Sequence, residues 1–312
     1  MPKPKLMFMG TPDFALPSLE KLISSGYPIV AVVTQPDRPK GRGKQLLAPP
    51  VKAVAITHNI LVLQPTRIKD SSFLETLKEL SPDIIVVAAF GQILPKEVLN
   101  FPQLGCINVH PSLLPKYRGA APINWTLIRG ETRTGVTIMY MDEGLDTGDI
   151  LLQEETPVGP DETFGLLHDR LSIMGADLLL KAVQLLEAKQ ASRIPQDNSL
   201  FTYAPMLKKE DGLINWNEDV KTIVNLIRGL SPSPGAYTFL DGKSLKIFAA
   251  TGTEHSVSGQ PGLLGNLNEQ GLQVTAGNGY VYLQDVQMEN RKRMNIADFL
   301  RGYKISPDKV LG

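Results

Sequence analysis

Two apolar runs near the amino end, Lys5 to Met9 and Ile29 to Thr34, are typical of buried strands. Between them, apolar residues over positions 14–23 recur at helical spacing, and Gly26 follows as a candidate helix C-cap. A strand–helix–strand unit of this kind requires parallel strands joined by a right-handed crossover. The chain is therefore expected to fold as an α/β protein with a mostly parallel sheet.

The next segments extend this pattern. Ile84 to Ala89 is wholly apolar, as a strand covered on both faces must be. Further strands are predicted over residues 60–63, 136–141 and 150–155, and helices over 51–58, 73–80, 122–128 and 164–186. Gly10-Thr11-Pro12 follows the first strand but is not the GxGxxG dinucleotide fingerprint, so no NAD is predicted.

The last hundred residues have a different pattern. One helix is predicted over residues 220–229, followed by short strands over 236–240, 245–250, 272–276 and 280–286. Asp241-Gly242 and Asn278-Gly279 are the predicted hairpin turns. This spacing favours a small antiparallel β-barrel, of which the oligonucleotide-binding (OB) fold is one form. We expect a Rossmann-like catalytic domain over residues 1–189, a polar linker over 190–207 and an OB-like barrel over 208–312.

Composition narrows the class of protein. The 312 residues are 42% hydrophobic and 21% charged with a formal net charge of +0, so a nucleic-acid partner would have to meet local basic patches. The one cysteine, Cys106, excludes an intramolecular disulfide. We find no secretory signal and no apolar run of membrane-spanning length, and we expect a cytoplasmic protein.

One stretch carries candidate chemistry. Asn108 and His110 stand two apart at a predicted strand end, so their side chains leave on the same face. Asp146 lies in a glycine-bracketed loop that could return a carboxylate to the imidazole. An amide and an imidazole can donate hydrogen bonds to an oxyanion, which suits acyl transfer, one-carbon transfer or hydrolysis. The spacing alone favours a purely structural interpretation, in which Asn108 and His110 form a polar strand end and Asp146 is a turn residue.

Nothing else in the chain suggests a competing reaction. The four histidines, His58, His110, His168 and His255, lack the spacing of a metal site, so no metal is expected. No nucleophile motif is present, and Cys106 has no paired base beside it. Attack on a carbonyl by the substrate's own nucleophile is the chemistry that remains.

Three further segments are ambiguous. The Gln35 to Pro50 segment, with Arg38, Lys40, Arg42 and Lys44, is either a solvated loop or a phosphate-binding arm. Phe90 to Leu94 is either a turn of core residues or a backbone edge for a flat heterocycle. The cluster Arg291–Arg293 is either a solvated end or a phosphate contact.

Longer motifs add a resemblance. NVHPSLLPKYRG at 108–119 and GLDTGD at 144–149 resemble the signature of the 10-formyltetrahydrofolate-dependent formyltransferases. FMGTPDFALPSLEKL, TQPDRPKGRGKQL with the following PPVK, and AAFGQILPKEVL are similar to the branch of that family that formylates methionyl-tRNA. The resemblance spans nearly the whole chain.

The resemblance implies roles for individual residues. Asn108 and His110 would stabilise the oxyanion, while Asp146 would set the state of His110 and help to remove a proton from the amine. Folate would be held by Phe90, Gly91, Gln92, Ile93, Leu94, Ser112, Leu113, Leu114, Pro115, Met139, Asp142 and Gly144. Initiator methionyl-tRNA would be bound by Arg38, Lys40, Arg42, Lys44, Arg291, Lys292 and Arg293.

The resemblance also implies a monomer that makes formylmethionyl-initiator tRNA from 10-formyltetrahydrofolate. Two alternatives stay open. One is a formyltransferase acting on a small amine such as an amino sugar nucleotide, and the other is a non-catalytic RNA-binding protein built on a degenerate enzyme.

Overall fold

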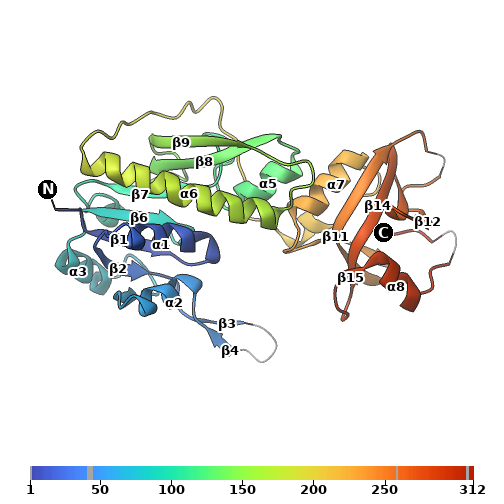
Figure 1. Cartoon of the computed structure of the whole chain (residues 1–312), viewed down its shortest axis with the longest axis horizontal. Coiled ribbons are helices and arrows are strands. Elements are labelled where there is room, and N and C mark those ends of the chain that lie inside the picture. The colour runs from blue at the N-terminus through green and yellow to red at the C-terminus, as the bar shows by residue number, and fades with distance from the viewer. Residues whose placement is uncertain (1, 41–44, 258, 307–308) are drawn as a thin grey trace. The chain divides into compact units, whose positions relative to one another are not determined.

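The computed structural model describes residues 2–40, 45–257, 259–306 and 309–312. Contacts divide the chain into two compact units that are interleaved in sequence (Figure 1). The N-terminal unit comprises Met1–Gly119, Thr134–Thr156 and His168–Tyr203. The C-terminal unit comprises Ala120–Arg133, Pro157–Leu167 and Ala204–Gly312. Each unit therefore contains segments from distant parts of the chain.

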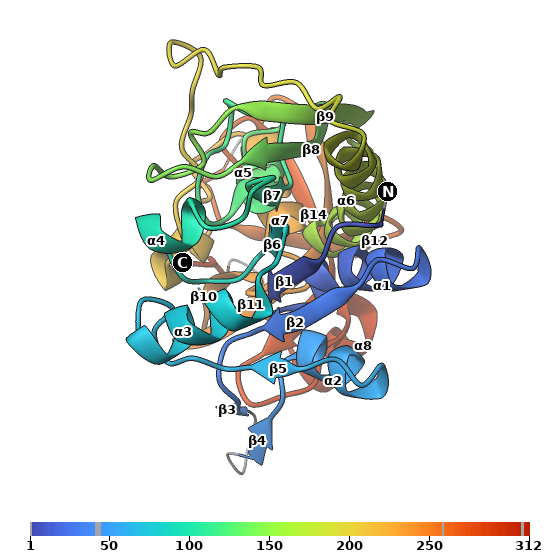
Figure 2. The same cartoon turned by 90° about the vertical axis from the view of Figure 1, so that its left-hand side faces the viewer.

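The N-terminal unit is built on one sheet, which among the described residues has the strand order β5-β2-β1-β6-β7-β8-β9 (Figure 2). Its strands are β1 (Leu6–Gly10), β2 (Ile29–Val33), β5 (Val62–Leu63), β6 (Ile84–Ala88), β7 (Cys106–His110), β8 (Arg133–Tyr140) and β9 (Ile150–Pro157). The pairs among β5, β2, β1, β6 and β7 are parallel, whereas β8 runs antiparallel to β7. The Rossmann-like sheet predicted from the sequence is confirmed.

The strand order reverses direction between β1 and β6. The chain moves outward from β1 through β2 to β5, then returns to β6 on the other side of β1 and continues to β7. In open sheets of this kind, ligands bind beyond the carboxyl ends of the strands at such a switch point. The ends of β6 and β7 lie side by side, because Val87 is in register with Asn108.

Helices cover both faces of this sheet. Figure 2 shows α1 (Leu16–Ser24) and α6 (Phe164–Glu187) on one side, with α3 (Ser71–Leu80) and α4 (Lys96–Leu99) on the other. The unit also contains η1 (Asp13–Ala15) and α2 (Pro50–Thr57). All residues of β1 and β6 are buried, which explains their uninterrupted apolar sequences. Gly175 of α6 brings that helix close to β7, since an added Cβ would lie 2.8 Å from Val109 Cγ1.

The segment expected to be a loop around Arg42 includes a short hairpin. Its strands β3 (Arg38–Lys40) and β4 (Gln45–Leu47) pair antiparallel, with Arg38 opposite Leu47. The run of basic residues, glycines and prolines shows no apolar alternation, so no strand was predicted here. Arg42 and Lys44 lie outside the described residues.

The base of this hairpin is fixed by a polar network. Lys52 Nζ lies 2.9 and 2.8 Å from the carboxylate oxygens of Asp37 and 2.8 Å from Gln64 Oε1. Gln64 Nε2 in turn donates to Asp37 Oδ1 at 2.8 Å and to the Gln35 carbonyl at 2.9 Å. Three side chains therefore anchor the start of the hairpin to α2 and to the segment after β5.

The C-terminal unit contains an antiparallel sheet. Among the described residues its strand order is β10-β11-β14-β13-β12, with β15 beside β14. The strands are β10 (Ala236–Leu240), β11 (Lys243–Glu254), β12 (Leu264–Asn268), β13 (Gly271–Ala276), β14 (Gly279–Met288) and β15 (Met294–Asn295). The helices are α5 (Pro122–Ile128), η2 (Lys209–Gly212), α7 (Val220–Gly229) and α8 (Ile296–Gly302). The predicted all-antiparallel second domain is confirmed.

The two predicted hairpin turns have different outcomes. Leu240 pairs with Lys243 around Asp241 and Gly242, whose φ angles of 53° and 72° suit such a turn, so the first prediction is confirmed. Ala276 pairs with Gly279, so the second turn is Gly277-Asn278 and the prediction of Asn278-Gly279 is wrong by one residue. Gly279 is the first residue of β14. Glycine is required there because an added Cβ would lie 2.2 Å from the Thr253 carbonyl oxygen.

No helix among the residues described here is long and apolar enough to cross a membrane.

Candidate active site

Strand β7 presents Asn108 and His110 on one face of the sheet. Val109 between them faces α6, so both polar side chains face the opposite side. The His110 side chain is buried, with 5% of its surface exposed. Asn108 is half-buried, and its carboxamide bonds to no residue that the structure describes. The strand end therefore combines a fixed imidazole with an amide free to bind a substrate.

The imidazole of His110 lies between a backbone carbonyl and a carboxylate. Nε2 is 3.0 Å from the Tyr117 carbonyl oxygen, and Nδ1 is 3.7 Å from Asp146 Oδ2. The Tyr117 carbonyl oxygen can only accept a hydrogen bond, so the ring hydrogen is assigned to Nε2. Nδ1 is then the ring atom that can exchange a proton. Its separation from Asp146 is longer than a hydrogen bond, which leaves Nδ1 able to bond a substrate or water.

Asp146 is held in an unusual backbone conformation. Its φ of 54° lies in the left-handed region, which costs a non-glycine residue about 1–2 kcal/mol. Its Oδ2 accepts a hydrogen bond from the Gly119 N–H at 2.8 Å. Gly148 lets the loop close on β8, because an added Cβ would lie 1.8 Å from the Tyr140 carbonyl oxygen. These contacts bring the carboxylate to the histidine, as the glycine-bracketed loop suggested.

A second layer of side chains supports this loop, and sequence reasoning missed it. Arg118 is 4% exposed and donates from Nε and Nη2 to Gln196 Oε1 at 3.1 and 2.7 Å. Gln196 Nε2 then donates to the carbonyl oxygens of Asp146 and Gly148 at 2.9 and 2.7 Å. Arg118 also donates to Asn198 Oδ1 at 2.8 Å. The polar run that contains Gln196 has no periodicity, so no sequence signal identified it.

The segment around Gln196 is packed into the N-terminal unit. Ile194 exchanges backbone hydrogen bonds with Ile150, at 2.8 and 3.0 Å. Thr202 accepts from the Tyr117 N–H through Oγ1 and from the Arg118 N–H through its carbonyl, each at 2.9 Å. Much of the stretch expected to be a linker thus supports the residues that contact His110 and Asp146.

The turn after β6, where folate residues were expected, has a free backbone edge. The side chains of Phe90 and Leu94 are buried, whereas that of Ile93 is 86% exposed. Thr11 Oγ1 and Gln35 Nε2 donate to the Phe90 carbonyl at 3.0 and 3.3 Å and fix the turn from behind. The N–H and C=O groups of Ile93 and Leu94 bond to none of the described residues. They can pair with the polar edge of a heterocycle.

Some predicted folate contacts have other partners. Gln92 Oε1 accepts from the Ile68 N–H at 3.0 Å, and its Nε2 donates to the Pro65 carbonyl at 3.4 Å. The side chains of Ser112, Leu114 and Met139 are buried. Ser112 Oγ donates to the Lys116 carbonyl at 2.7 Å. These residues form the framework of the cleft rather than an exposed lining.

The remaining predicted folate residues lie on the surface or near it. Gly91 has a φ of 85° and is exposed, while Leu113 and Pro115 are half-buried. Asp142 and Gly144 are exposed, and Asp142 Oδ1 accepts from the Gly144 N–H at 3.0 Å and from Thr147 Oγ1 at 2.7 Å. Asp142 thereby organises the loop that carries Asp146.

The predicted tRNA contacts fall into two groups in different units. Arg38 is exposed at the base of the hairpin and donates to Gln35 Oε1 at 3.3 Å, and Lys40 ends β3. Arg291, Lys292 and Arg293 are exposed in the C-terminal unit. Arg293 Nη2 lies 2.5 Å from Asp285 Oδ2, and its guanidinium lies 4.5 Å from the Phe248 ring centroid. Part of that cluster's charge is therefore neutralised within the protein.

Comparison with known proteins identifies the family. The model of the formyl transferase family matches residues 4–183, and the model of the formyl transferase C-terminal domain matches residues 206–304. The chain belongs to the formyl transferase family. It is 76% identical over 312 residues to a methionyl-tRNA formyltransferase of Syntrophus aciditrophicus (strain SB), covering 100% of both chains. It is 53% identical to one of Geotalea uraniireducens (strain Rf4), covering 99% of this chain and 98% of the other.

Solved structures share the fold at lower identity. HypX from Aquifex aeolicus in complex with tetrahydrofolic acid matches with a TM-score of 0.66 and 18% identity over 97% of this chain. The match covers 48% of HypX, so this chain spans about half of that protein. WlaRD, a sugar 3N-formyl transferase, matches with a TM-score of 0.67 and 20% identity, covering 92% of this chain and 98% of the other.

Two other features of this formyl transferase bear on its chemistry. Burial raises the pKa of the Cys106 thiol to about 12, so this group is not a nucleophile at neutral pH. In the described part of the chain, no group of three or more His, Cys, Asp or Glu side chains could hold a metal ion.

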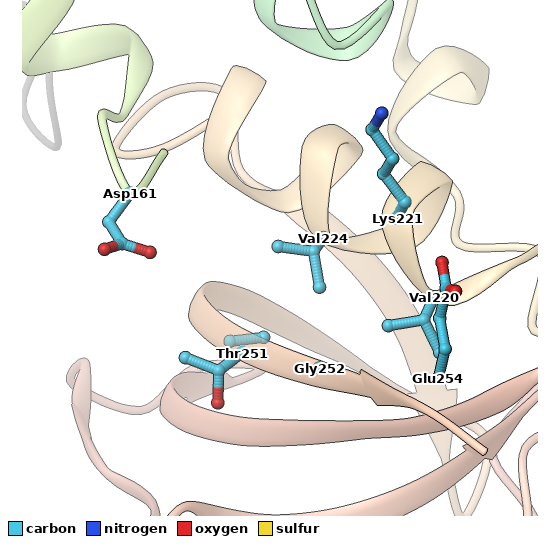
Figure 3. Close-up of a pocket in the computed structure, with 8 residues that line it drawn as sticks. Asp161, Val220, Lys221, Val224, Thr251, Gly252 and Glu254 are labelled. Carbon is cyan, nitrogen blue, oxygen red and sulfur yellow. The ribbon is translucent and has the colours of Figure 1, made fainter. Parts of the chain in front are cut away.

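A hollow of about 520 Å³ lies in the C-terminal unit between α7 and β11 (Figure 3). It is lined by Asp161, Val220, Lys221, Val224, Ala250, Thr251, Gly252 and Glu254. These residues combine an apolar floor with two carboxylates and one ammonium, and they include no imidazole. The hollow therefore lacks an imidazole–carboxylate pair like that of His110 and Asp146 at the end of β7.

Proposed function

We propose that the protein transfers the formyl group of 10-formyltetrahydrofolate to the α-amino group of methionyl-tRNA. The product is formylmethionyl-initiator tRNA, used in translation initiation. The observation that carries the proposal is the 76% identity to a methionyl-tRNA formyltransferase over the full length of both chains. The sugar-directed formyl transferase WlaRD shares only 20% identity with this chain.

The geometry at β7 supports the roles proposed for three residues. When bound, 10-formyltetrahydrofolate would supply a formyl carbon for attack by the amine nitrogen, and the bond from that carbon to N10 would break as N10 takes a proton. Asn108 donates from its free amide to the charge that develops on the formyl oxygen. His110 would help to stabilise the same developing charge through Nδ1, the ring atom that can exchange a proton. Asp146 is proposed to set the state of His110 and, through water, to help remove the proton that the amine loses.

The turn after β6 supports the proposed folate position. A flat heterocycle with alternating donors and acceptors requires a backbone edge with both kinds of group free. Ile93 and Leu94 provide such an edge, next to the strand that ends at His110. The remaining folate residues are proposed to shape the cleft, with Leu113, Pro115 and Gly144 at its surface. In the proposed arrangement the reacting carbon would lie near Asn108.

Substrate choice is proposed to lie outside the reacting groups. The hairpin carrying Arg38, Lys40, Arg42 and Lys44 would meet the acceptor arm, while Arg291, Lys292 and Arg293 would meet the phosphate backbone. We assign catalysis to residues 1–189 and tRNA binding to residues 208–312, joined by 190–207. The protein is proposed to act as a monomer in the cytoplasm, where initiator tRNA is charged.

Formyl transfer tests the proposal directly. The purified protein is mixed with 10-formyltetrahydrofolate and either methionyl-initiator tRNA, free methionine or a dTDP-linked amino sugar, and labelled formyl product is measured. We expect product with the tRNA alone, and a rate that falls steeply with salt because phosphate contacts release counterions. Formylation of the amino sugar without formylation of the tRNA would support the small-amine alternative and overturn the proposal.

A further inference from the structure

The loop that carries Asp146 needs support from outside itself. Residues Asp142 to Leu145 are exposed, and Asp146 has a strained positive φ. Strained conformations persist only where surrounding contacts over-determine them. The Gly119 N–H holds the Asp146 carboxylate, and Asp142 binds Gly144 and Thr147, but none of these contacts holds the carbonyls of Asp146 and Gly148. Another group must therefore fix the peptide units around Asp146.

Gln196 makes this contact, and its chemistry fixes its orientation. Arg118 has only hydrogen-bond donors, so the atom of Gln196 that faces it must be the carbonyl oxygen. The amide nitrogen then faces the loop and has two hydrogens for two carbonyl acceptors, those of Asp146 and Gly148. All these contacts are 3.1 Å or shorter. Arg118 thus leaves no alternative placement for the glutamine amide.

The same segment of chain also contacts the imidazole. Tyr117 binds His110 through its carbonyl, Arg118 binds Gln196 through its side chain, and Gly119 binds Asp146 through its N–H. Residues 117–119 and Gln196 therefore form a closed set of contacts around the histidine–aspartate pair. A shift of the 146–148 backbone would change the distance of 3.7 Å between Nδ1 and Oδ2.

We propose that Gln196 is a positioning residue for formyl transfer, holding the 146–148 backbone so that Asp146 faces Nδ1 of His110. The proposal rests on the formyl transfer proposed above. Gln196 acts through Asp146 and does not touch the substrate. Misplacing a reacting group by about 1 Å can cost about 100-fold in rate, so the effect appears in kcat rather than in KM.

Two substitutions distinguish the contact that the Gln196 carbonyl oxygen makes with Arg118 from the contacts that its amide nitrogen makes with the loop. Gln196→Glu keeps an acceptor for Arg118 but removes the donor to the loop, whereas Gln196→Met removes both in a neutral side chain of similar length. Asn198→Ala is the matched control, because it removes a partner of Arg118 and leaves the loop contacts intact. We expect both Gln196 variants to lose about 10- to 100-fold in kcat with KM for tRNA and folate within about twofold. Asn198→Ala should lose less than about threefold.

A double-substitution cycle distinguishes positioning from a general structural role. If Gln196 acts through Asp146, adding Gln196→Met to Asp146→Asn should lower kcat by less than about twofold further. Losses that multiply, or a Gln196→Met variant with normal kcat, would overturn the proposal. Thermal unfolding of each variant identifies those whose loss reflects misfolding.

Hydrogen exchange of the 142–149 amides gives a readout that does not need activity. We expect faster exchange there in Gln196→Glu and Gln196→Met, and unchanged exchange in Asn198→Ala. Unchanged exchange in all three variants would overturn the proposal. A wild-type protein that does not formylate methionyl-tRNA would refute the proposed function, while the exchange data would still decide the role of Gln196.

Discussion

Two polar networks in the N-terminal unit share one design but lie in different surroundings. In each, a glutamine side chain accepts from a cation and donates to a backbone carbonyl: Gln196 accepts from Arg118, and Gln64 accepts from Lys52. Arg118 is 4% exposed, whereas the side chains of Lys52 and Asp37 are 20% and 33% exposed. The first network holds the loop that carries Asp146, and the second anchors the start of the β3–β4 hairpin.

This difference in burial indicates a difference in task. A buried cation left without its partners costs several kcal/mol, so the Arg118 network has one stable arrangement and can fix the reacting groups. An exposed pair contributes about 0–1 kcal/mol and tolerates movement. Such an anchor suits the start of a surface hairpin more than it suits a reacting group. We therefore expect substitutions near the first network to change kcat and those near the second to change the KM for tRNA.

The largest effect is expected at Asn108, on the catalytic side of the comparison. Asn108→Ala removes the free amide that donates to the formyl oxygen and should lower kcat by about 10²–10³. Steady-state formylation of methionyl-tRNA measures the loss. Asn100→Ala, at the exposed C-terminus of α4, is the control and should keep full activity. Near-normal turnover of Asn108→Ala would remove this residue from the mechanism.

Asp146→Asn should lower kcat by about 100-fold, in the lower part of the range for a positioned acid–base group. The new carboxamide can still accept from the Gly119 N–H through its oxygen, so the loop is expected to stay folded. It cannot take the proton from the amine. The measurement is kcat together with the KM for folate, which should change little. A large increase in that KM with normal kcat would instead indicate a role in folate binding.

Lys52→Met should affect the second network, which anchors the hairpin. Loss of the bonds to Asp37 and Gln64 frees the base of the hairpin, so the KM for tRNA should rise about 5- to 10-fold, equivalent to about 1–1.4 kcal/mol. Both kcat and the KM for folate should stay near normal. Lys69→Met, an exposed lysine nearby, is the control. A fall in kcat alone would show that the two networks do not divide their tasks.

The protonation of Asp37 sets the pH range over which its contact with Lys52 anchors the hairpin. The hydrogen bond from Lys52 holds the pKa of Asp37 below its ordinary value. A lowered pKa in the folded state contributes stability above the ordinary value of about 4, and that stability is lost as the pH falls through the lowered pKa. In the protein with Lys52 in place, the carboxylate of Asp37 is therefore ionised and the anchor complete at neutral pH.

The smallest effect is expected at Cys106, which belongs to neither network. Because burial raises the pKa of its thiol to about 12, iodoacetamide at pH 8 should leave the native protein unmodified and fully active. Mass spectrometry before and after unfolding in guanidinium measures the modification. Rapid alkylation of the native protein with loss of activity would show that the strand end at Asn108 opens in solution.

Sequence patterns predicted the parts of the fold that are built on apolar repetition. Strands β1 and β6 are continuous apolar runs because helices cover both faces, and the spacing of α6 follows from its contact with the sheet. Strand β12 was missed because only Leu264 in it is buried, which leaves no alternation to detect. The hairpin β3–β4 was missed because its basic residues, glycines and prolines show no apolar alternation.

Site residues were predicted where one strand or one glycine-rich loop carries them. Asn108 and His110 follow from the two-residue period of a strand, and Asp146 from the glycines that bracket it. Gln196 could not be predicted, because its partners are distant backbone carbonyls that no local pattern marks. Arg118 was quoted within a motif, but its role as the partner of Gln196 depends on the folded path of residues 194–202.

The interleaving of the two units also has a consequence for synthesis of the chain. A nascent chain released at residue 183, where the first family match ends, would carry Asn108, His110 and Asp146 but not Gln196 or Thr202. The ribosome must pass Tyr203 before the N-terminal unit has all its segments, and α5 of the C-terminal unit has by then already been made. A fragment cut at the family boundary is therefore expected to lack the contacts through which Gln196 and Thr202 support Asp146 and Tyr117.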